Sequence, residues 1–301
     1  MANTLITPSV IAARALATLY NTAVLAMLVH RDFDSEFDGK VGDTISVKKP
    51  ATFQVDEYDR NSGINIQNIV ESTTPVALDT LLDVSVAVTA EELTLKLEDF
   101  DEQVLSPAME AIVQDIDGRL AEALVDQATS DGASGDGTGN NEDRAFREAR
   151  AKLGRAKMPL QNRSAVLSPE AVSECLGNDI FVRADASGST DGLREASIGR
   201  VFGFNTYESQ VFGYGPGDKG QADGVAFHRD SVALVSRALE LPMDSDGSKA
   251  SRAGYKGFAL RVVKDYDINK KQDVVSIDTL IGVKKGLRTD AAVELDFGLG
   301  S

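Results

Sequence analysis

The stretch Ser106–Gln127, SPAMEAIVQDIDGRLAEALVDQ, carries the longest uninterrupted helical pattern in the chain. Its apolar residues recur at steps of three and four, which places them in one stripe along a helix. They are Met109, Ile112, Val113, Ile116, Leu120, Ala123 and Leu124. Ser106 is the expected N-cap, and Pro107 suits the first helical position because its missing N–H would be unpaired there. The sequence therefore predicts a helix of about 30 Å that acts as a scaffold for the strand-like segments on both sides.

A glycine and an acidic face are the irregular features of this predicted helix. Gly118 costs about 1 kcal/mol relative to alanine in a helix interior, and we expect the helix to bend there. The polar residues fall largely off the apolar stripe, namely Glu110, Gln114, Asp117, Glu122 and Asp126. We therefore expect this acidic face to point toward solvent or a neighbouring subunit.

The residues before the long helix predict another helix and a strand-rich projection. Segment 9–29 reads as a helix capped by Ser9, and so apolar a segment needs cover from the chain's own core or from a neighbouring subunit. Residues 41–89 read as long paired strands with a strongly polar tip, and Leu82–Thr89 alternates most regularly among them. These strands contain little that could close a core by themselves. The projection therefore needs a partner surface.

The segments after the long helix predict a mixture of helices and strands. A loop rich in Gly, Ser and Asp at 130–143 is the expected internal boundary. It is followed by a basic helix at Arg144–Lys157, a strand at Arg163–Leu167 and a helix in SPEAVSECL that is capped by Ser168. From Arg200 onward, β-prone runs alternate with glycine-rich turns. The sequence thus predicts an α+β fold in which one long helix packs against antiparallel strands.

The bulk composition is that of a soluble globular protein with ample material for a core. The chain has 301 residues, of which 42% are hydrophobic and 26% are charged. Its longest apolar stretches are far shorter than the roughly 18 residues that span a bilayer, and residues 1–30 lack the pattern of a secretory signal. A single cysteine, Cys175, cannot form an intramolecular disulfide, which fits a cytosolic site of synthesis.

The net charge of −16 is unevenly distributed along the chain. Residues 1–103 hold 7 Lys/Arg against 17 Asp/Glu, a net of −10, whereas residues 229–301 hold 12 against 11, a net of +1. This asymmetry is either chance variation or a sign that the acidic part of one copy meets the less acidic part of another. Tight sequence-specific DNA binding is disfavoured, because the net negative charge of the protein repels phosphates. The basic helix at 144–157 could contact nucleic acid only at the phosphate backbone of the nucleic acid, independently of base sequence.

The sequence contains no complete catalytic, cofactor or metal signature. His30 and His228 are far apart and read as structural or surface residues, and Cys175 reads as a packed thiol on an amphipathic helix. One acidic cluster could hold a hard cation such as calcium, although a solvated helix entrance is the favoured interpretation: Glu98, Asp99, Asp101 and Glu102. A calcium-like loop starting at Asp244 fails, because Tyr255 stands where a bidentate Glu is needed. We therefore assign no catalytic, cofactor-binding or metal-binding residues.

Two runs carry a family resemblance. GDTISVKKPATFQ at 42–54 and LDVSVAVTAEELTLKLEDFDEQVLSPAM at 82–109 resemble the major capsid (coat) proteins of tailed bacteriophages, especially the short-tailed-phage branch with the Hong Kong 97-like fold. VHRDF, SPEAV and AFHRDSVALVSRAL stand in the order that this family has, so the resemblance spans nearly the whole chain. These motifs are structural, and no catalytic signature is among them.

The resemblance implies a division into named parts. Residues 1–35 would form an N-terminal arm and 36–90 an extended hairpin, the E-loop. Residues 91–129 and about 252–301 would form the peripheral (P) domain on a long spine helix, and about 130–251 the axial (A) domain. The family lacks cofactors, and its members are structural proteins, not enzymes.

The leading hypothesis is a major capsid protein whose hexamers and pentamers form an icosahedral head around packaged double-stranded DNA. Its expected partners are further copies of itself, scaffolding and portal proteins, and DNA through non-specific contact only. We expect no membrane partner. It would be assembled in the host cytoplasm and located in the virion. The candidate contacts between subunits are at the E-loop tip: Asp56, Glu57, Asp59 and Arg60. The alternatives are an encapsulin-like compartment shell and, remotely, a metal-dependent hydrolase that uses the acidic clusters.

Overall fold

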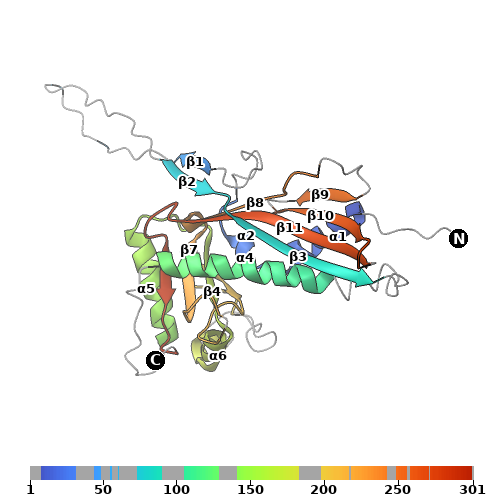
Figure 1. Cartoon of the computed structure of the whole chain (residues 1–301). Coiled ribbons are helices and arrows are strands. Elements are labelled where there is room, and N and C mark those ends of the chain that lie inside the picture. Colours follow the sequence, from blue (N-terminus) through green and yellow to red (C-terminus); the bar gives the residue numbers. More distant parts are fainter. Residues whose placement is uncertain are drawn as a thin grey trace.

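The computed structural model describes residues 8–31, 44–48, 55, 60, 73–89, 105–128, 141–182, 198–216, 218–242, 249–255, 258–270 and 272–299. These residues form helices, two five-stranded sheets and a separate two-stranded ladder, which confirms the predicted α+β class. In Figure 1 the long helix α4 (Ser106–Gln127) runs across the molecule beside the first sheet, with the second sheet on the opposite side of it.

The first sheet is entirely antiparallel. Its strand order is β3 (Thr80–Thr89), β11 (Gln272–Lys285), β10 (Phe258–Asp267) and β9 (Ala250–Tyr255). β8 (Val232–Arg237) also pairs with β11, from Leu280 to Lys285. The predicted alternation is confirmed over 82–87, since Leu82, Val84 and Val86 are half-buried while Asp83, Ser85 and Ala87 are exposed.

The second sheet contains one exception to the predicted antiparallel pairing. Its strand order is β12 (Ala292–Leu295), β7 (Gly224–His228), β4 (Arg163–Leu167), β6 (Phe204–Glu208) and β5 (Arg200–Val201). β4 and β6 are parallel, and helices α6 (Pro169–Gly177) and α7 (Asp179–Val182) lie between them in sequence. A parallel pair needs such a crossover connection.

The predicted strand at 163–167 and the helix after it are confirmed. All five residues of β4 are buried, as expected of a central strand. Ser168 caps α6 by accepting a hydrogen bond from the backbone N–H of Ala171 at 3.1 Å, and Pro169 occupies the first turn. The basic helix α5 spans Asn141–Arg155, close to its predicted range.

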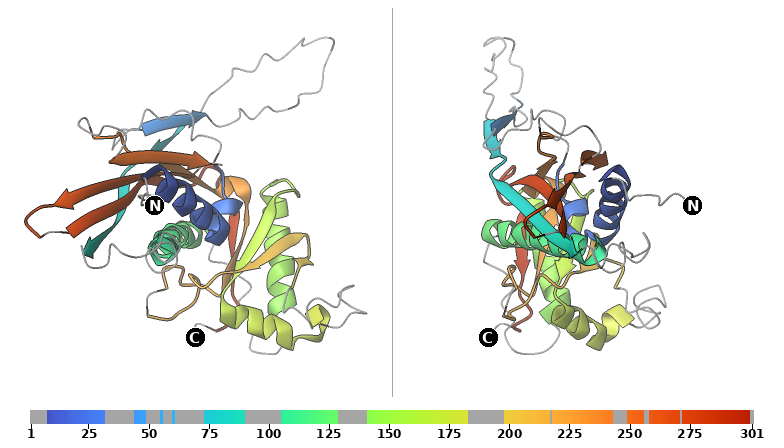
Figure 2. Two further views of the ribbon diagram at one scale, coloured as in Figure 1. Left: turned by 90° about the vertical axis from the view of Figure 1, so that its right-hand side faces the viewer. Right: turned by 45° about the vertical axis from the view of Figure 1, so that its right-hand side comes forward.

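The ladder of β1 (Thr44–Lys48) and β2 (Thr73–Ala77) is antiparallel, with Thr44 opposite Ala77. Figure 2 shows it at one side of the body, outside the two five-stranded sheets. The paired strands predicted within 41–89 are therefore confirmed for this ladder. Leu82–Thr89 does not join it, because β3 pairs along its whole length with β11. Val76 and Leu78 hold the base of the ladder in a small buried cluster with strands β8 and β11.

The apolar stripe of α4 lies in the main core. This core includes residues of α1 (Pro8–Thr22), of the first sheet and of the second sheet, so one helix packs against both sheets. A second core lies among α5, α6 and the other face of the second sheet, around Phe146 and Phe204. The predicted scaffold role of the long helix is confirmed by these contacts.

Three details of the sequence prediction are wrong. The N-cap of α4 is Leu105 with no side-chain cap bond, and Ser106 is already helical. The helix predicted at 9–29 is two helices, α1 and α2 (Leu25–Leu28), separated at Ala23 and Val24. The expected bend at Gly118 is absent, because α4 is one continuous helix from Ser106 to Gln127 and its ribbon is straight in Figure 1. Gly118 instead makes room for Lys219, since an added Cβ would lie 2.6 Å from Lys219 Cδ.

Candidate functional site

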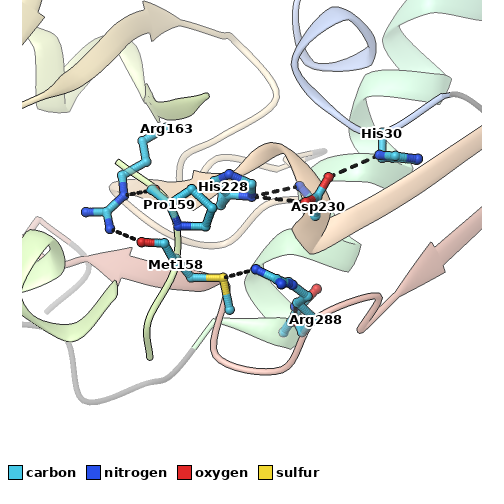
Figure 3. Close-up of polar contacts among 8 residues, drawn as sticks. His30, Met158, Pro159, Arg163, His228, Asp230 and Arg288 are labelled. Carbon is cyan, nitrogen blue, oxygen red and sulfur yellow. Dashed lines mark hydrogen bonds and ion pairs between the residues drawn. The ribbon is translucent and has the colours of Figure 1, made fainter. Parts of the chain in front are cut away.

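The two histidines, which are 198 positions apart in sequence, meet at one carboxylate. His30 Nδ1 lies 3.1 Å from Asp230 Oδ1, and His228 Nδ1 lies 3.6 Å from Asp230 Oδ2 (Figure 3). Asp230 belongs to the short 3-10 helix η4 (Arg229–Ser231), which links β7 to β8. The sequence prediction considered the two histidines separately, because no motif near either residue indicates that the fold brings them together.

His228 is a structural residue of this junction, as the sequence suggested. Its side chain is buried, and Nδ1 accepts a hydrogen bond from the backbone N–H of Asp230 at 3.2 Å. Burial lowers the pKa of His228, the Asp230 carboxylate opposes this shift, and the nearby Arg288 and Arg163 guanidinium groups reinforce it. The ring is therefore held neutral, which suits a hydrogen-bond acceptor at a helix N-cap.

Two arginines complete the junction through polar contacts to one turn (Figure 3). Arg163 donates to the backbone carbonyls of Met158 and Pro159, both at 2.8 Å. Arg288 Nη1 lies 3.7 Å from Met158 Sδ. These groups orient backbone and leave no activated nucleophile, so the junction is suited to joining parts of the fold and not to chemistry on a substrate.

Asp117 lies on the buried side of α4, so the prediction that it faces solvent or a neighbouring subunit is wrong. It is buried, and its two carboxylate oxygens accept hydrogen bonds from the backbone N–H groups of Val24 at 3.0 Å and Ala26 at 3.1 Å. Burial raises the pKa of Asp117, while these backbone N–H groups act in the opposite direction. The carboxylate thus accepts hydrogen bonds from backbone N–H groups at the start of α2 that have no partner within the helix, and it fixes the N-terminal segment to α4. Asp117 stands three residues before the buried Leu120 and therefore lies on the apolar stripe. This spacing could have predicted that Asp117 is buried.

A surface ion-pair group ties a loop to the next turn of α4. Asp115 pairs with Arg119 at 2.7 Å and with Lys219, whose side chain passes over Gly118. Burial raises the pKa of Asp115, but hydrogen bonds and charge from Lys219 and Arg119 outweigh it and leave the pKa below its usual value. The loop that carries Lys219 is thereby attached to the helix through charged, partly exposed groups.

A groove with a volume of about 470 Å³ lies between α4 and the loop after β6. Its lining combines the carboxylates of Glu110, Asp117 and Glu208 with valine side chains. Histidine, cysteine and lysine are not among its lining residues.

Cys175 is a packed thiol, as predicted. It is fully buried in the second core, where burial, aided by the charges of Glu142 and Glu174, raises its pKa to about 12. Among the described residues, no group of three His, Cys, Asp or Glu side chains could hold a metal ion. No helix in the described part of the chain is long and apolar enough to cross a membrane.

Most of the predicted contact residues lie outside the described residues. Asp56, Glu57 and Asp59 do so, and Arg60 is described only as an exposed turn residue. The acidic cluster at 98–102 and the calcium-like segment at 244–247 also lie outside the described residues.

Comparison with known proteins identifies the fold. No protein-family model matches the sequence, and no curated protein does. A structure from Mycobacterium phage Che8 superposes with a TM-score of 0.66 at 19% identity, over 91% of this chain and 91% of that chain. The asymmetric unit of the bacteriophage PhiM1 mature capsid gives a TM-score of 0.58 at 14% identity, over 86% and 82%.

The chain has a Hong Kong 97-like capsid fold. A virus-like particle from Pyrococcus furiosus also matches, with a TM-score of 0.51 at 13% identity, over 95% of this chain and 97% of that chain. These similarities run almost end to end, so the two sheets and the long helix are parts of one fold and not separate modules. At such low identity they show the fold alone.

Proposed function

We propose that the chain is the major capsid protein of a tailed bacteriophage and that its copies assemble into an icosahedral head around double-stranded DNA. The observation that carries the proposal is the match to the PhiM1 mature capsid over more than four-fifths of both chains. The β1–β2 ladder is consistent with it, because a two-stranded ladder outside the two main sheets gains cover from neighbouring copies. The structural role requires no catalytic centre, metal or cofactor.

The finer assignments follow from the same proposal. Residues 1–35 are the N-terminal arm, 36–90 the E-loop, 91–129 and about 252–301 the P-domain, and about 130–251 the A-domain. The protein belongs to the short-tailed-phage branch, and scaffolding and portal proteins are its assembly partners. The excess of acidic residues supports non-specific, weak contact with the enclosed DNA, since a wall of this charge repels phosphates.

A shell that encloses protein cargo is the second candidate function. The match to the Pyrococcus furiosus virus-like particle over 97% of that chain favours it, because the fold alone does not specify what a shell contains. The metal-dependent hydrolase hypothesis has no observation in its favour.

Assembly is tested by expressing the chain alone and with a candidate scaffolding protein. Sedimentation and negative-stain microscopy should then show closed shells of uniform size. A chain that stays monomeric under both conditions would contradict the shell proposal. Nucleic-acid and protein analysis of particles isolated from the native source separates a DNA-filled head from a cargo compartment.

The E-loop tip is tested by reversing its charges. We expect the triple variant D56K/E57K/D59K to lose most of its particle yield while the free subunit keeps its unfolding temperature, because only contacts between copies are changed. The matched control D56N/E57Q/D59N removes the charges without reversing them and should have an intermediate effect. Particle yield and salt tolerance equal to wild type in the lysine variant would show that the tip is not a contact.

A further inference from the structure

The short helix η4 connects the second sheet to the first, because it joins β7 to β8. On the side of the second sheet, the backbone N–H of Arg229 donates to the Asn162 carbonyl at 3.0 Å. On the side of the first sheet, His30 exchanges backbone hydrogen bonds with β8, at 3.1 Å to the Val232 carbonyl and 2.9 Å from the Leu234 N–H. A change in the conformation of η4 therefore changes how the two sheets are held relative to each other.

His228 fixes the conformation of η4 through its Nδ1. This nitrogen accepts the Asp230 N–H at 3.2 Å, which caps the turn. While Nδ1 accepts this hydrogen bond, the neutral ring carries its one proton on Nε2. The backbone of Gln161 favours a proton on the ring, as an accepting carbonyl does.

A second proton on this ring is incompatible with the observed arrangement. Protonated Nδ1 becomes a donor and can no longer accept the Asp230 N–H. The new charge lies near the guanidinium groups of Arg163 and Arg288, which disfavour it, while the Asp230 carboxylate favours it. That carboxylate already contacts His30 and lies 3.6 Å from His228 Nδ1, so a closer pair requires η4 to turn.

We propose that His228 is a proton-sensitive residue that fixes the conformation of η4, the connection between the two sheets. At neutral pH the ring caps η4 through the Asp230 amide. At mildly acid pH the protonated ring pairs with the Asp230 carboxylate, the cap is lost and η4 opens. This device belongs to the single chain and does not depend on the proposed shell function.

The pH window follows from the direction of the shift. Burial holds the pKa of His228 below its ordinary value of 6.5, so the unfolded or opened chain binds the proton more readily than the closed one. The stabilising contribution is therefore complete above pH 6.5 and is lost as the pH falls through the lowered pKa. Between pH 7.5 and pH 5.0 the opening equilibrium can change by at most about 30-fold, the limit for a group that ionises at 6.5 when open.

Hydrogen–deuterium exchange of the full chain at pH 7.5 and 5.0 tests the proposal, with rates corrected for intrinsic exchange. We expect protection at residues 228–234 to fall between about 3-fold and 30-fold in the wild type. H228N should show no such fall, because an Asn Oδ1 can accept the Asp230 N–H but does not titrate. The matched control H30Q removes the other histidine and should keep the fall. An equal loss of protection in H228N, or none in the wild type, overturns the proposal.

Direct observation of the wild-type imidazole keeps the test valid if H228N does not fold. Nitrogen chemical shifts should show a neutral ring protonated on Nε2 at pH 7.5. The Asp230 amide resonance should move with the His228 titration. A His228 that titrates while the Asp230 amide stays unchanged would also overturn the proposal.

Discussion

Replacing Asp117 with Asn tests whether this buried carboxylate attaches the N-terminal segment to α4. The substitution keeps the shape of the side chain but replaces one of two accepting oxygens with an NH₂ group. That group then faces the backbone N–H of Val24 or Ala26, which lie 3.0 and 3.1 Å from the present oxygens. One backbone N–H at the start of α2 then faces the NH₂ donor of the asparagine and is left buried without an acceptor.

The expected cost follows from the two hydrogen bonds. A bond to a charged acceptor contributes about 1.5–3 kcal/mol, and an unsatisfied buried donor costs about 1–3 kcal/mol. Removing a buried charge relieves its desolvation, which offsets part of this loss, since burial raises the pKa of Asp117. We therefore expect D117N to lose about 2–3 kcal/mol. With an unfolding entropy of about 2.1 cal/mol/K per residue over 301 residues, Tm falls by about 3–5 °C.

Calorimetry and hydrogen exchange of the free subunit give the readouts. The matched control is D126N on the same helix, where an exposed carboxylate pairs with Lys285 at 2.7 Å. An exposed pair contributes about 0–1 kcal/mol, so the control should shift Tm by less than about 2 °C. D117N should also speed exchange at residues 23–28. Equal Tm values for the two variants, with unchanged exchange at 23–28, would refute the attachment role of Asp117.

Two glycines and the cysteine give further tests. G118A should stay within about 1 kcal/mol of wild type, because the helix gains about that much and only the flexible Lys219 side chain must move. G282A should lose roughly 1–3 kcal/mol or more in the same denaturation assay, because its Cβ would overlap the backbone carbonyl of Ala77; equal midpoints for the two variants would contradict this. Cys175, with a pKa of about 12, should resist iodoacetamide at pH 8 and react on unfolding, and rapid labelling of the native protein would show that it is not packed as described.

Features governed by nearby residues could be predicted from the sequence. The limits of α4, the alternation in β3 and the Ser168 cap each depend on a window of residues that are neighbours in the chain. The same windows could not show that β3 pairs with β11 or that β4 and β6 are parallel, because these pairings join distant segments. The resemblance to capsid proteins supplied the fold where periodicity could not.

The candidate site was harder to predict because its polar groups act at a distance. Asp117 was assigned to a solvent face by its charge, although its spacing from Val113 and Leu120 places it on the buried stripe. The meeting of His30 and His228 at Asp230 depends on where β8 begins in three dimensions, and no sequence motif records that. The buried Asp117 carboxylate therefore marks a contact between two segments, because a buried charge needs hydrogen bonds that offset its desolvation.

The polar residues of α4 fix two different segments with different strength. Asp117 holds the N-terminal segment through hydrogen bonds to backbone in a buried setting, so breaking this contact leaves groups unsatisfied. Lys219 holds its loop through a partly exposed pair with Asp115, which water and salt can replace at a cost of about 0–1 kcal/mol. A rearrangement that keeps α4 fixed should therefore release the Lys219 loop before the N-terminal segment. High salt should increase exchange at 211–220 and leave that at 23–28 unchanged, since screening acts on the exposed pair.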